Sequence, residues 1–128
     1  MKLLLDTHIW LWSVLDTSHL GRHTLQALNH SGNELWLSPV STWEALLLAR
    51  KGRITLQGDL DDWFSDATAN THEAPLSHEI VIAAHKLQMH SDPADRFLAA
   101  TAQVLGLTLV TADEKLLGLG NVQSLANR

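Results

Sequence analysis

The sequence predicts an α/β fold: one domain in which a central, mainly parallel sheet of four or five strands is covered by helices on both faces, forming a three-layer α/β/α sandwich. Two observations predict this fold. Short, almost wholly apolar runs alternate along the chain with longer segments of helical periodicity, which is the pattern of βαβ units. The length of 128 residues is that of one domain, so we expect residues 1–128 to form a single unit.

Three apolar runs have the features of buried parallel strands. Leu3–Leu5 stops at a polar residue, Leu35–Leu37 is closed by a Ser-Pro pair, and Leu107–Val110 is the clearest strand of the C-terminal half. Weaker signals predict a strand at His72–Ala74 and an edge strand at Val122–Leu125. Four or five strands are therefore expected.

The segments between the strands have helical character. Apolar residues recur three and four positions apart in the best of them, and Gly52 and Gly106 end two of them. The predicted helices are Ile9–Leu15, Leu20–Leu28, Ser41–Lys51, Leu60–Ala69, Ser77–Met89, Pro93–Leu105 and Ala112–Leu117.

Composition limits the kind of site and the compartment. The chain has no cysteine, which excludes disulfides, thiolate nucleophiles and cysteine-based zinc sites and fits a reducing cytosol. We expect neither a signal peptide nor a membrane span, because no apolar run is long enough, and so expect a cytoplasmic protein. The formal net charge of −5 argues at first sight against a nucleic-acid partner, since phosphate-binding domains are usually basic.

Four carboxylates stand at predicted helix starts. Asp6 follows the first strand, Glu44 lies in the first turn after the second, Asp95 follows the Asp92-Pro93 pair, and Asp113 follows the Leu107–Val110 strand. Each could be a structural feature only. Asp6 can cap the first helix, Asp92 is a good N-cap before a proline, and the pairs Ser41/Glu44 and Thr111/Glu114 have the spacing of capping boxes.

The four acids together indicate a metal site. In a parallel sheet the helix starts converge outside the carboxyl ends of the strands, where ligands bind. Carboxylates brought together repel one another, and a bound cation relieves the repulsion. Oxygen ligands without His or Cys suit Mg²⁺ or Mn²⁺, which leave room for a phosphate oxygen and an attacking water.

At these residues the chain resembles the PIN-domain ribonucleases, and within them the VapC-type toxins of toxin–antitoxin pairs. The resemblance covers nearly the whole chain, and its four pieces agree in order and spacing. They are Leu4–His8, Ser38–Glu44, Asp92–Ala102 and Leu109–Asp113. The resemblance implies a Mg²⁺- or Mn²⁺-dependent endoribonuclease that is a homodimer and is inhibited by a cognate antitoxin protein occupying a groove near the active site.

The resemblance also assigns roles. It carries the acidic quartet over to Asp6, Glu44, Asp95 and Asp113: the three aspartates as metal ligands, directly or through water, and Glu44 holding the ion through water or orienting the attacking water. Thr7 and Thr111 match the hydroxyl positions beside the first and last acids, and Thr111 could hydrogen-bond a metal-bound water or a ligand carboxylate, or cap a helix. Asp92 is a further acid for which capping suffices. Two roles are open for Arg96, contacting a phosphate or pairing with a carboxylate.

Histidines offer a different chemistry, but their spacing does not support it. The chain has eight, and a metal-independent ribonuclease would use such residues with the RNA 2′-hydroxyl. His19 and His23 are four apart on a predicted helix without a third ligand, so we interpret them as part of a solvated face. His8 is expected to pack near Asp6, and His72, His78, His85 and His90 show no ligand spacing.

Two further features bear on partners. The cluster Arg50-Lys51-Gly52-Arg53 compensates a helix dipole and could also touch RNA at the flank of the site or bind an acidic antitoxin segment. The tryptophans suit a core or dimer interface, or base stacking for one of them, and the sequence does not choose among Trp10, Trp12, Trp36, Trp43 and Trp63.

One other class of function stays open. A catalytically silent PIN-like module would bind RNA or protein without cleaving, although such a module could lose any of the four acids, and all four are present. Phosphotransfer domains fit less well, because Asp59 follows no strand and the segment Asp6–His8 lacks a second aspartate.

Overall fold

A five-stranded sheet forms the centre of the molecule. In the computed structural model, which describes residues 1–88 and 92–128, the strands are β1 (Lys2–Leu5), β2 (Glu34–Leu37), β3 (Thr71–Glu73), β4 (Thr108–Thr111) and β5 (Ser124–Ala126). Their order is β3-β2-β1-β4-β5 and every pairing is parallel. The predicted parallel sheet is confirmed, with the weak edge strands included.

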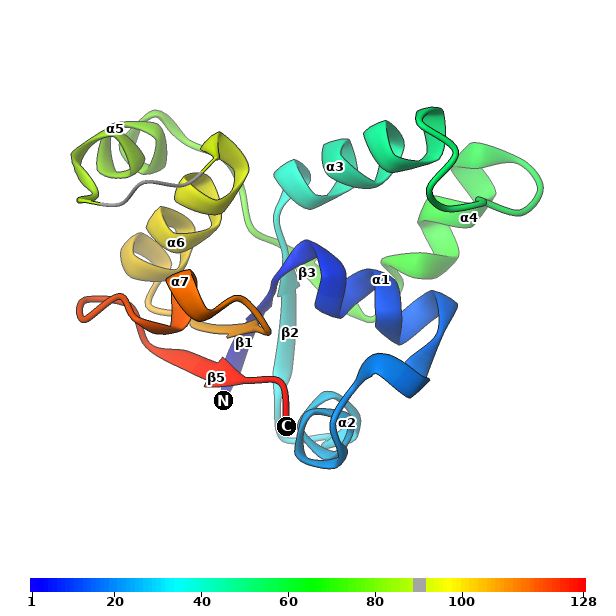
Figure 1. The fold of residues 1–128 in the computed structure, drawn as a ribbon, viewed down its shortest axis with the longest axis horizontal. Helices are drawn as coiled ribbons and strands as arrows, with labels where there is room; N and C mark the ends of the chain where they lie inside the picture. The colour runs from blue at the N-terminus through cyan, green and yellow to red at the C-terminus, as the bar shows by residue number, and fades with distance from the viewer. Residues whose placement is uncertain (89–91) are drawn as a thin grey trace.

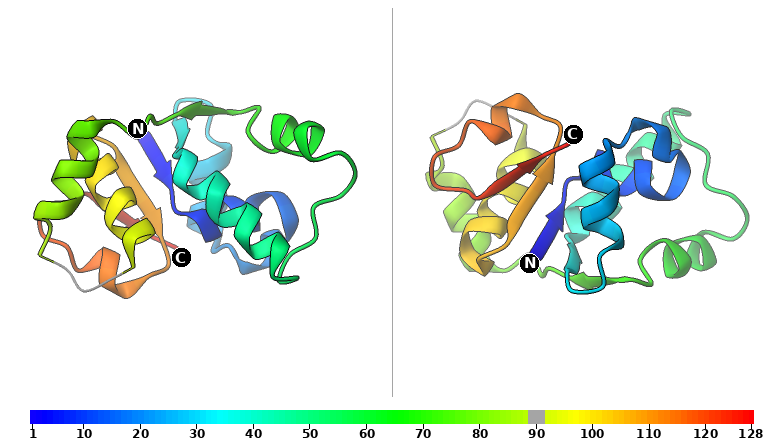
Figure 2. Two further views of the ribbon diagram at one scale, coloured as in Figure 1. Left: turned by 90° about the horizontal axis from the view of Figure 1, so that it is seen from above. Right: turned by 90° about the horizontal axis from the view of Figure 1, so that it is seen from below.

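Helices cover both faces of the sheet. They are α1 (Thr7–Leu15), α2 (Arg22–Asn29), α3 (Pro39–Arg50), α4 (Leu60–Ala67), α5 (His78–Lys86), α6 (Pro93–Leu105) and the short α7 (Glu114–Leu117), with a 3₁₀ turn η1 at Thr17–His19. In Figures 1 and 2, α5 and α6 lie on one side of β1, and α1, α3 and α4 lie on the other. The predicted three-layer sandwich is therefore confirmed.

Alternation along the central strands divides the core in two. Leu4 and Leu109 point into a cluster with α5 and α6, built on Ile80, Leu98 and neighbouring residues. Leu3, Leu5 and Val110 point the other way, into a cluster with α1 and α3 that includes the buried Trp10. Because side chains alternate across a strand, apolar runs such as Leu3–Leu5 are needed to fill both layers.

The tryptophans divide between core and surface. Trp10 is 1% exposed and donates its indole N–H to the Ala67 carbonyl (2.9 Å), while Trp63 packs edge-on against it, with ring centroids 6.0 Å apart. Trp43 on α3 is 57% exposed. The expectation that most tryptophans are core residues therefore does not extend to Trp43.

The connection from α1 to α2 differs from the prediction. A helix was expected over Leu20–Leu28, but Leu20 and Gly21 are extended and α2 begins at Arg22. Thr17–His19 form the separate turn η1, capped by the Asp16 carboxylate, which accepts hydrogen bonds from Ser18. The His19–His23 pair is thus not on one helix, and that expectation is wrong.

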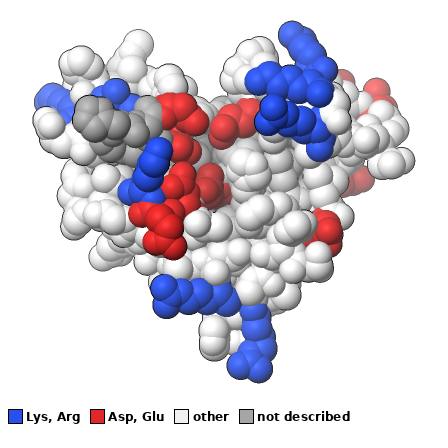
Figure 3. Space-filling view, viewed as in Figure 1, with Lys and Arg blue, Asp and Glu red and all other residues white. Residues whose placement is uncertain are grey.

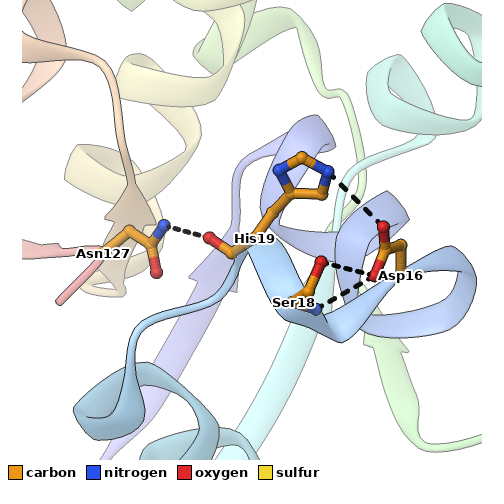
Figure 4. A network of polar contacts seen from close by, with 4 residues as sticks. All are labelled: Asp16, Ser18, His19 and Asn127. Atoms are coloured by element: carbon orange, nitrogen blue, oxygen red, sulfur yellow. Dashed lines mark hydrogen bonds and ion pairs between the residues drawn. The ribbon is translucent and has the colours of Figure 1, made fainter.

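The C-terminal residues dock at this connection (Figure 4). The Asn127 side chain donates to the His19 carbonyl (2.9 Å) and accepts from the Gly21 N–H (2.8 Å). The Arg128 carbonyl accepts from the N–H groups of His23 (2.8 Å) and Thr24 (3.1 Å). These are N-terminal donors of α2, which have no partner inside the helix, so the chain end caps α2 in place of a side chain.

Other boundaries agree with the predicted ones within a few residues. Gly106 ends α6 in the left-handed conformation (φ 67°), as its position predicted. Helix α5 ends at Lys86, and the end predicted at Met89 lies outside the described residues. None of the described helices is long and apolar enough to cross a membrane.

Candidate active site

The sheet topology locates the site. From β1 the chain moves outward through β2 and β3, then returns to the other side of β1 to form β4 and β5. The order therefore reverses between β1 and β4, and in open α/β sheets ligands bind beyond the carboxyl ends of the strands at such a point. Asp6 directly follows β1, and Asp113 follows β4 by two residues.

A buried threonine links these two acids. Thr111, the last residue of β4, is fully buried and donates from its hydroxyl to Asp6 Oδ2 (2.7 Å). The same hydroxyl oxygen accepts from the Asp113 main-chain N–H (3.0 Å). Thr111 thereby fixes the orientation of the Asp6 carboxylate and ties it to the turn that carries Asp113.

A second threonine holds Glu44 in a similar way. The Thr7 hydroxyl lies 2.5 Å from Glu44 Oε1 and 2.8 Å from the Ser41 hydroxyl. A hydroxyl has one proton, so when Thr7 donates to Glu44 it accepts from Ser41. Thr7 and Ser41 are buried, and this chain of hydroxyls joins the start of α1 to the first turns of α3.

Helix α6 brings the remaining acids. Asp92 is its N-cap and accepts from the Asp95 N–H (3.0 Å), which confirms the predicted cap. Asp95 lies in the first turn, where a negative charge interacts favourably with the helix dipole. The charges of Asp92 and Asp95 both act on Glu44 across the space between α6 and α3.

The charges perturb one another. Burial raises the pKa of Asp6 above its ordinary value and outweighs the hydrogen bond from Thr111, and the negative charge of Asp113 adds to the rise. Burial also raises the pKa of Glu44 despite the hydrogen bond from Thr7, and the charges of Asp6, Asp92 and Asp95 raise it further. Raised carboxyl pKa values in a cleft are a feature of functional sites.

The acids surround a hollow on the surface. In Figure 3, acidic side chains gather about a depression between α6 and α3, and basic side chains lie beyond it over the far end of α3. Within residues 1–88 and 92–128, no three His, Asp or Glu side chains are arranged closely enough to hold a metal ion. The four predicted acids are thus close enough for their charges to interact, but no three of them are arranged as ready ligands of one ion.

Comparison with known proteins decides the family. The profile of the PIN domain family matches residues 3–121. This chain is a PIN domain. It is also 30% identical over 115 residues to Ribonuclease VapC22 of Mycobacterium tuberculosis, a match that covers 88% of each chain.

Solved structures show the same PIN fold. VapBC2 from Rickettsia felis, bound to a DNA fragment from its promoter, matches with a TM-score of 0.72 at 15% identity over 98% of each chain. A toxin–antitoxin complex from Klebsiella pneumoniae matches with a TM-score of 0.70 at 18% identity over 98% of each chain. FitAcB from Neisseria gonorrhoeae matches with a TM-score of 0.66 at 20% identity over 96% of each.

Capping is not the role of three residues for which the sequence of this PIN domain allowed it; for Thr111 the other predicted role, a hydrogen bond to a carboxylate of the site, is the one observed. Asp6 stands at the N-cap position of α1 but makes no side-chain cap bond. Ser38 caps α3, so Ser41 lies inside the helix, and Asp113 caps α7, so Thr111 belongs to β4. The hydroxyls of Ser41 and Thr111 are thereby available to the site.

Arg96 has a role that the sequence did not indicate. Its guanidinium donates to the carbonyls of Ala84 (2.9 Å) and His85 (3.0 Å) at the end of α5. A cation at a helix C-terminus satisfies carbonyls that lack partners within the helix. In this PIN domain Arg96 therefore caps α5 from α6.

Three of the histidines contact a tryptophan ring or a carboxylate outside the acidic site. His19 stacks on Trp12 with ring centroids 5.2 Å apart and pairs with Asp16 (3.5 Å), as Figure 4 shows for the latter contact. His72 lies 3.6 Å from a Glu34 oxygen, and His8 packs 5.8 Å from Trp12 between ring centroids. His90 is outside the described residues.

Two residues of the site were missed in the sequence. Ser41 was interpreted as a cap, although it precedes Glu44 by one helical turn and so shares its face. Trp43 was placed only in a general group of tryptophans, although it adjoins Glu44 and is exposed. Proximity along α3 to a candidate catalytic residue was the available signal for both.

Proposed function

We propose that this PIN domain is a metal-dependent endoribonuclease and the toxin of a toxin–antitoxin pair. The observation that supports it most is the meeting of four carboxylates, from the β1–α1 junction, α3, α6 and the turn after β4, at the switch point of the sheet. Similarity to a protein named as a ribonuclease supports the activity, and likeness to toxin–antitoxin complexes supports the biological role.

The donor set suits Mg²⁺ or Mn²⁺. Asp6, Asp95 and Asp113 would hold the ion directly or through water, and Glu44 through water, so that only hard oxygen ligands face it. The raised pKa of buried Asp6 fits this role, because a cation compensates the cost of its charge. When bound, such an ion supplies Lewis-acid stabilisation of the phosphodiester and lowers the pKa of a water.

The protein groups position the reaction. Thr111 hydrogen-bonds Asp6, and Thr7, supported by Ser41, hydrogen-bonds Glu44, which would orient the attacking water. Attack of water oxygen on phosphorus with departure of the 3′ oxygen leaves 5′-phosphate and 3′-hydroxyl ends. Asp92 supports the site by capping α6, and Arg96 does so by joining α6 to α5.

We also propose the partners that this function requires. The substrate is RNA, and the inhibitor is a cognate antitoxin protein; the likeness in fold to a toxin–antitoxin complex supports such a protein partner. The active toxin is a homodimer in the cytoplasm. The alternative is a silent PIN-like module that binds RNA or protein without cleaving it.

Cleavage assays separate the two functions. Purified protein is incubated with transfer and ribosomal RNA, with Mn²⁺ or EDTA, beside Asp6→Ala, Asp95→Ala and the control Asp62→Ala on exposed α4. We expect cleavage by wild type and control only, dependent on metal. Equal cleavage by all variants indicates a contaminating nuclease, and no cleavage together with no metal binding in calorimetry favours the silent module.

Expression in cells tests the toxin role. Production of the wild type should arrest growth, and co-expression of the neighbouring upstream gene should relieve the arrest. Asp95→Ala should not arrest growth. Arrest without relief by the neighbouring gene would contradict the toxin–antitoxin assignment while leaving the ribonuclease activity standing.

A further inference from the structure

An apolar groove adjoins the acidic hollow. It lies between α3 and α6, has a volume of about 550 Å³, and has apolar walls from Trp43, Leu47 and Phe97 together with Leu76. Glu44 and Asp92, which belong to the acidic site, also line it. The groove and the proposed reaction site are therefore continuous.

Trp43 is the unusual residue of this groove. It is 57% exposed, whereas the other tryptophans are buried or half-buried. Trp43 and Glu44 both line the groove, so the indole shares this space with a proposed catalytic carboxylate. An exposed aromatic face next to a nuclease site offers a stacking surface for a base, because every base has a π-face.

Charge selects what part of an RNA enters the groove. Carboxylates in the wall repel phosphates, whereas a nucleobase is uncharged and planar and can lie against Trp43 with its polar edge toward the acids. Cationic side chains follow along the same helix. Trp43, Leu47 and Arg50 are spaced i, i+4, i+7 and share one face of α3. Arg50, Lys51 and Arg53 are exposed there, about 10 Å further along the helix.

We propose that this groove is a base-binding subsite: an unpaired nucleobase next to the cleaved bond stacks on Trp43, and the following phosphates pass toward Arg50 and Lys51. The subsite makes the substrate single-stranded at this position, since a paired base cannot leave its helix to stack on protein without losing its pair. This inference rests on the proposed ribonuclease function and adds the substrate feature that the site recognises.

Two substitutions of Trp43 test stacking against mere apolar contact. Trp43→Phe keeps an aromatic face, and Trp43→Leu keeps apolar bulk without one. Leu60→Ala, at an exposed leucine on α4, is the control. On single-stranded RNA with Mn²⁺ we expect KM to rise about tenfold for Trp43→Leu, to rise clearly less for Trp43→Phe, which keeps an aromatic face, and to match wild type for Leu60→Ala.

A second measurement does not depend on cleavage. RNA containing 5-bromouridine is irradiated with the wild type, and the cross-linked residue is identified by mass spectrometry. A cross-link at Trp43 supports the subsite even if no RNA is cut, in which case only the proposed activity fails. Cleavage with unchanged KM in Trp43→Leu and no cross-link at Trp43 overturns the subsite and leaves the ribonuclease standing.

The groove could instead belong to the protein inhibitor. Co-purification with the upstream gene product is therefore measured for the same variants. If Trp43→Leu loses that protein while its KM for RNA is unchanged, the groove binds a protein and the base-binding subsite is wrong.

Discussion

Hydroxyl groups hold two carboxylates of this site in place. Thr111 donates to Asp6 and Thr7 to Glu44, and both threonines are buried. Hydrogen bonds to a carboxylate lower its pKa, yet in both acids burial prevails and the pKa is raised. The two carboxylates are therefore held in place, but their negative charges are destabilised by burial. A bound cation would offset this cost.

Replacing Asp6 by asparagine should stabilise the apo protein. A raised pKa means that the folded state resists ionisation of Asp6, so at neutral pH its charge lowers the free energy of unfolding. Asp6→Asn removes the charge and keeps an oxygen that accepts from Thr111. In urea denaturation at pH 7 we expect a gain of about 1 kcal/mol. The gain should shrink as the pH falls through the raised pKa of Asp6 and vanish below 3.8, its ordinary pKa, where Asp6 is neutral in both the folded and the unfolded protein.

Asp16→Asn is the matched control. Asp16 is exposed, and hydrogen bonds from Ser18 lower its pKa, so its charge favours folding at neutral pH. The stabilisation from the Asp16 charge is present at pH 7 and is lost on acidification. Asp16→Asn should therefore not stabilise the protein at pH 7. If Asp6→Asn proved as destabilising as a typical core change, burial of the Asp6 charge would not be the dominant effect.

The sequence predicted the acids, and a hydrogen bond from Thr111 to a carboxylate as one of two roles, but not which residues hold which acid. Asp6, Glu44, Asp92, Asp95 and Asp113 stood out because they stand at predicted helix starts, several of them directly after a strand. Ser41 and Thr111 have the local pattern of caps, and capping uses only neighbours along the chain. Their actual partners, Thr7 and Asp6, are 34 and 105 residues away in sequence, which local pattern cannot reveal.

Helix α2 shows the same limit for an element. It begins after Gly21, which offers no capping side chain, and its free N–H groups are satisfied by the Arg128 carbonyl. The helix was predicted to start at Leu20 because its apolar spacing extends that far. Its start is instead set by the contact with Arg128, which is more than a hundred residues away in sequence. Periodicity within the helix does not indicate such a contact.

Gly21→Ala should break this cap. A Cβ at Gly21 would lie 1.8 Å from the Arg128 carbonyl carbon, so the C-terminal residues must move away and uncover α2. We expect the free energy of unfolding to fall by about 1–2 kcal/mol, the usual cost of losing an N-cap. Thermal denaturation measures the loss, and hydrogen exchange should show faster exchange at His23 and Thr24.

Gly120→Ala serves as the comparison, because a Cβ there meets no atom within 4 Å. It should leave stability and exchange at α2 unchanged. Asn127→Ala removes the side chain that holds Gly21 and His19 without adding an atom, and should also expose α2. Slow exchange at His23 in all three variants would show that the chain end does not cap α2.

Charge acts through its distribution over the whole molecule. The formal net charge of −5 argued against RNA, but acids gather at the hollow between α3 and α6 while Arg50, Lys51 and Arg53 lie at the end of α3 (Figure 3). At this scale the sequence did predict the order of the elements, the parallel sheet and the convergence of its strand ends. The net charge misled because it averages a repulsive centre with an attractive flank.

RNA binding should therefore respond to where a charge is removed. Asp95→Asn and Asp62→Asn each remove one negative charge, the first at the site and the second on exposed α4. In EDTA, Asp95→Asn should bind a phosphorothioate oligoribonucleotide about threefold more tightly than wild type, and Asp62→Asn should change little. With Mg²⁺ the order should reverse, because wild type gains a bound cation that Asp95→Asn holds poorly. Fluorescence anisotropy at constant ionic strength measures the affinity in both buffers.

Equal effects of the two substitutions in both buffers would mean that only total charge matters, and that phosphate does not approach the acidic hollow.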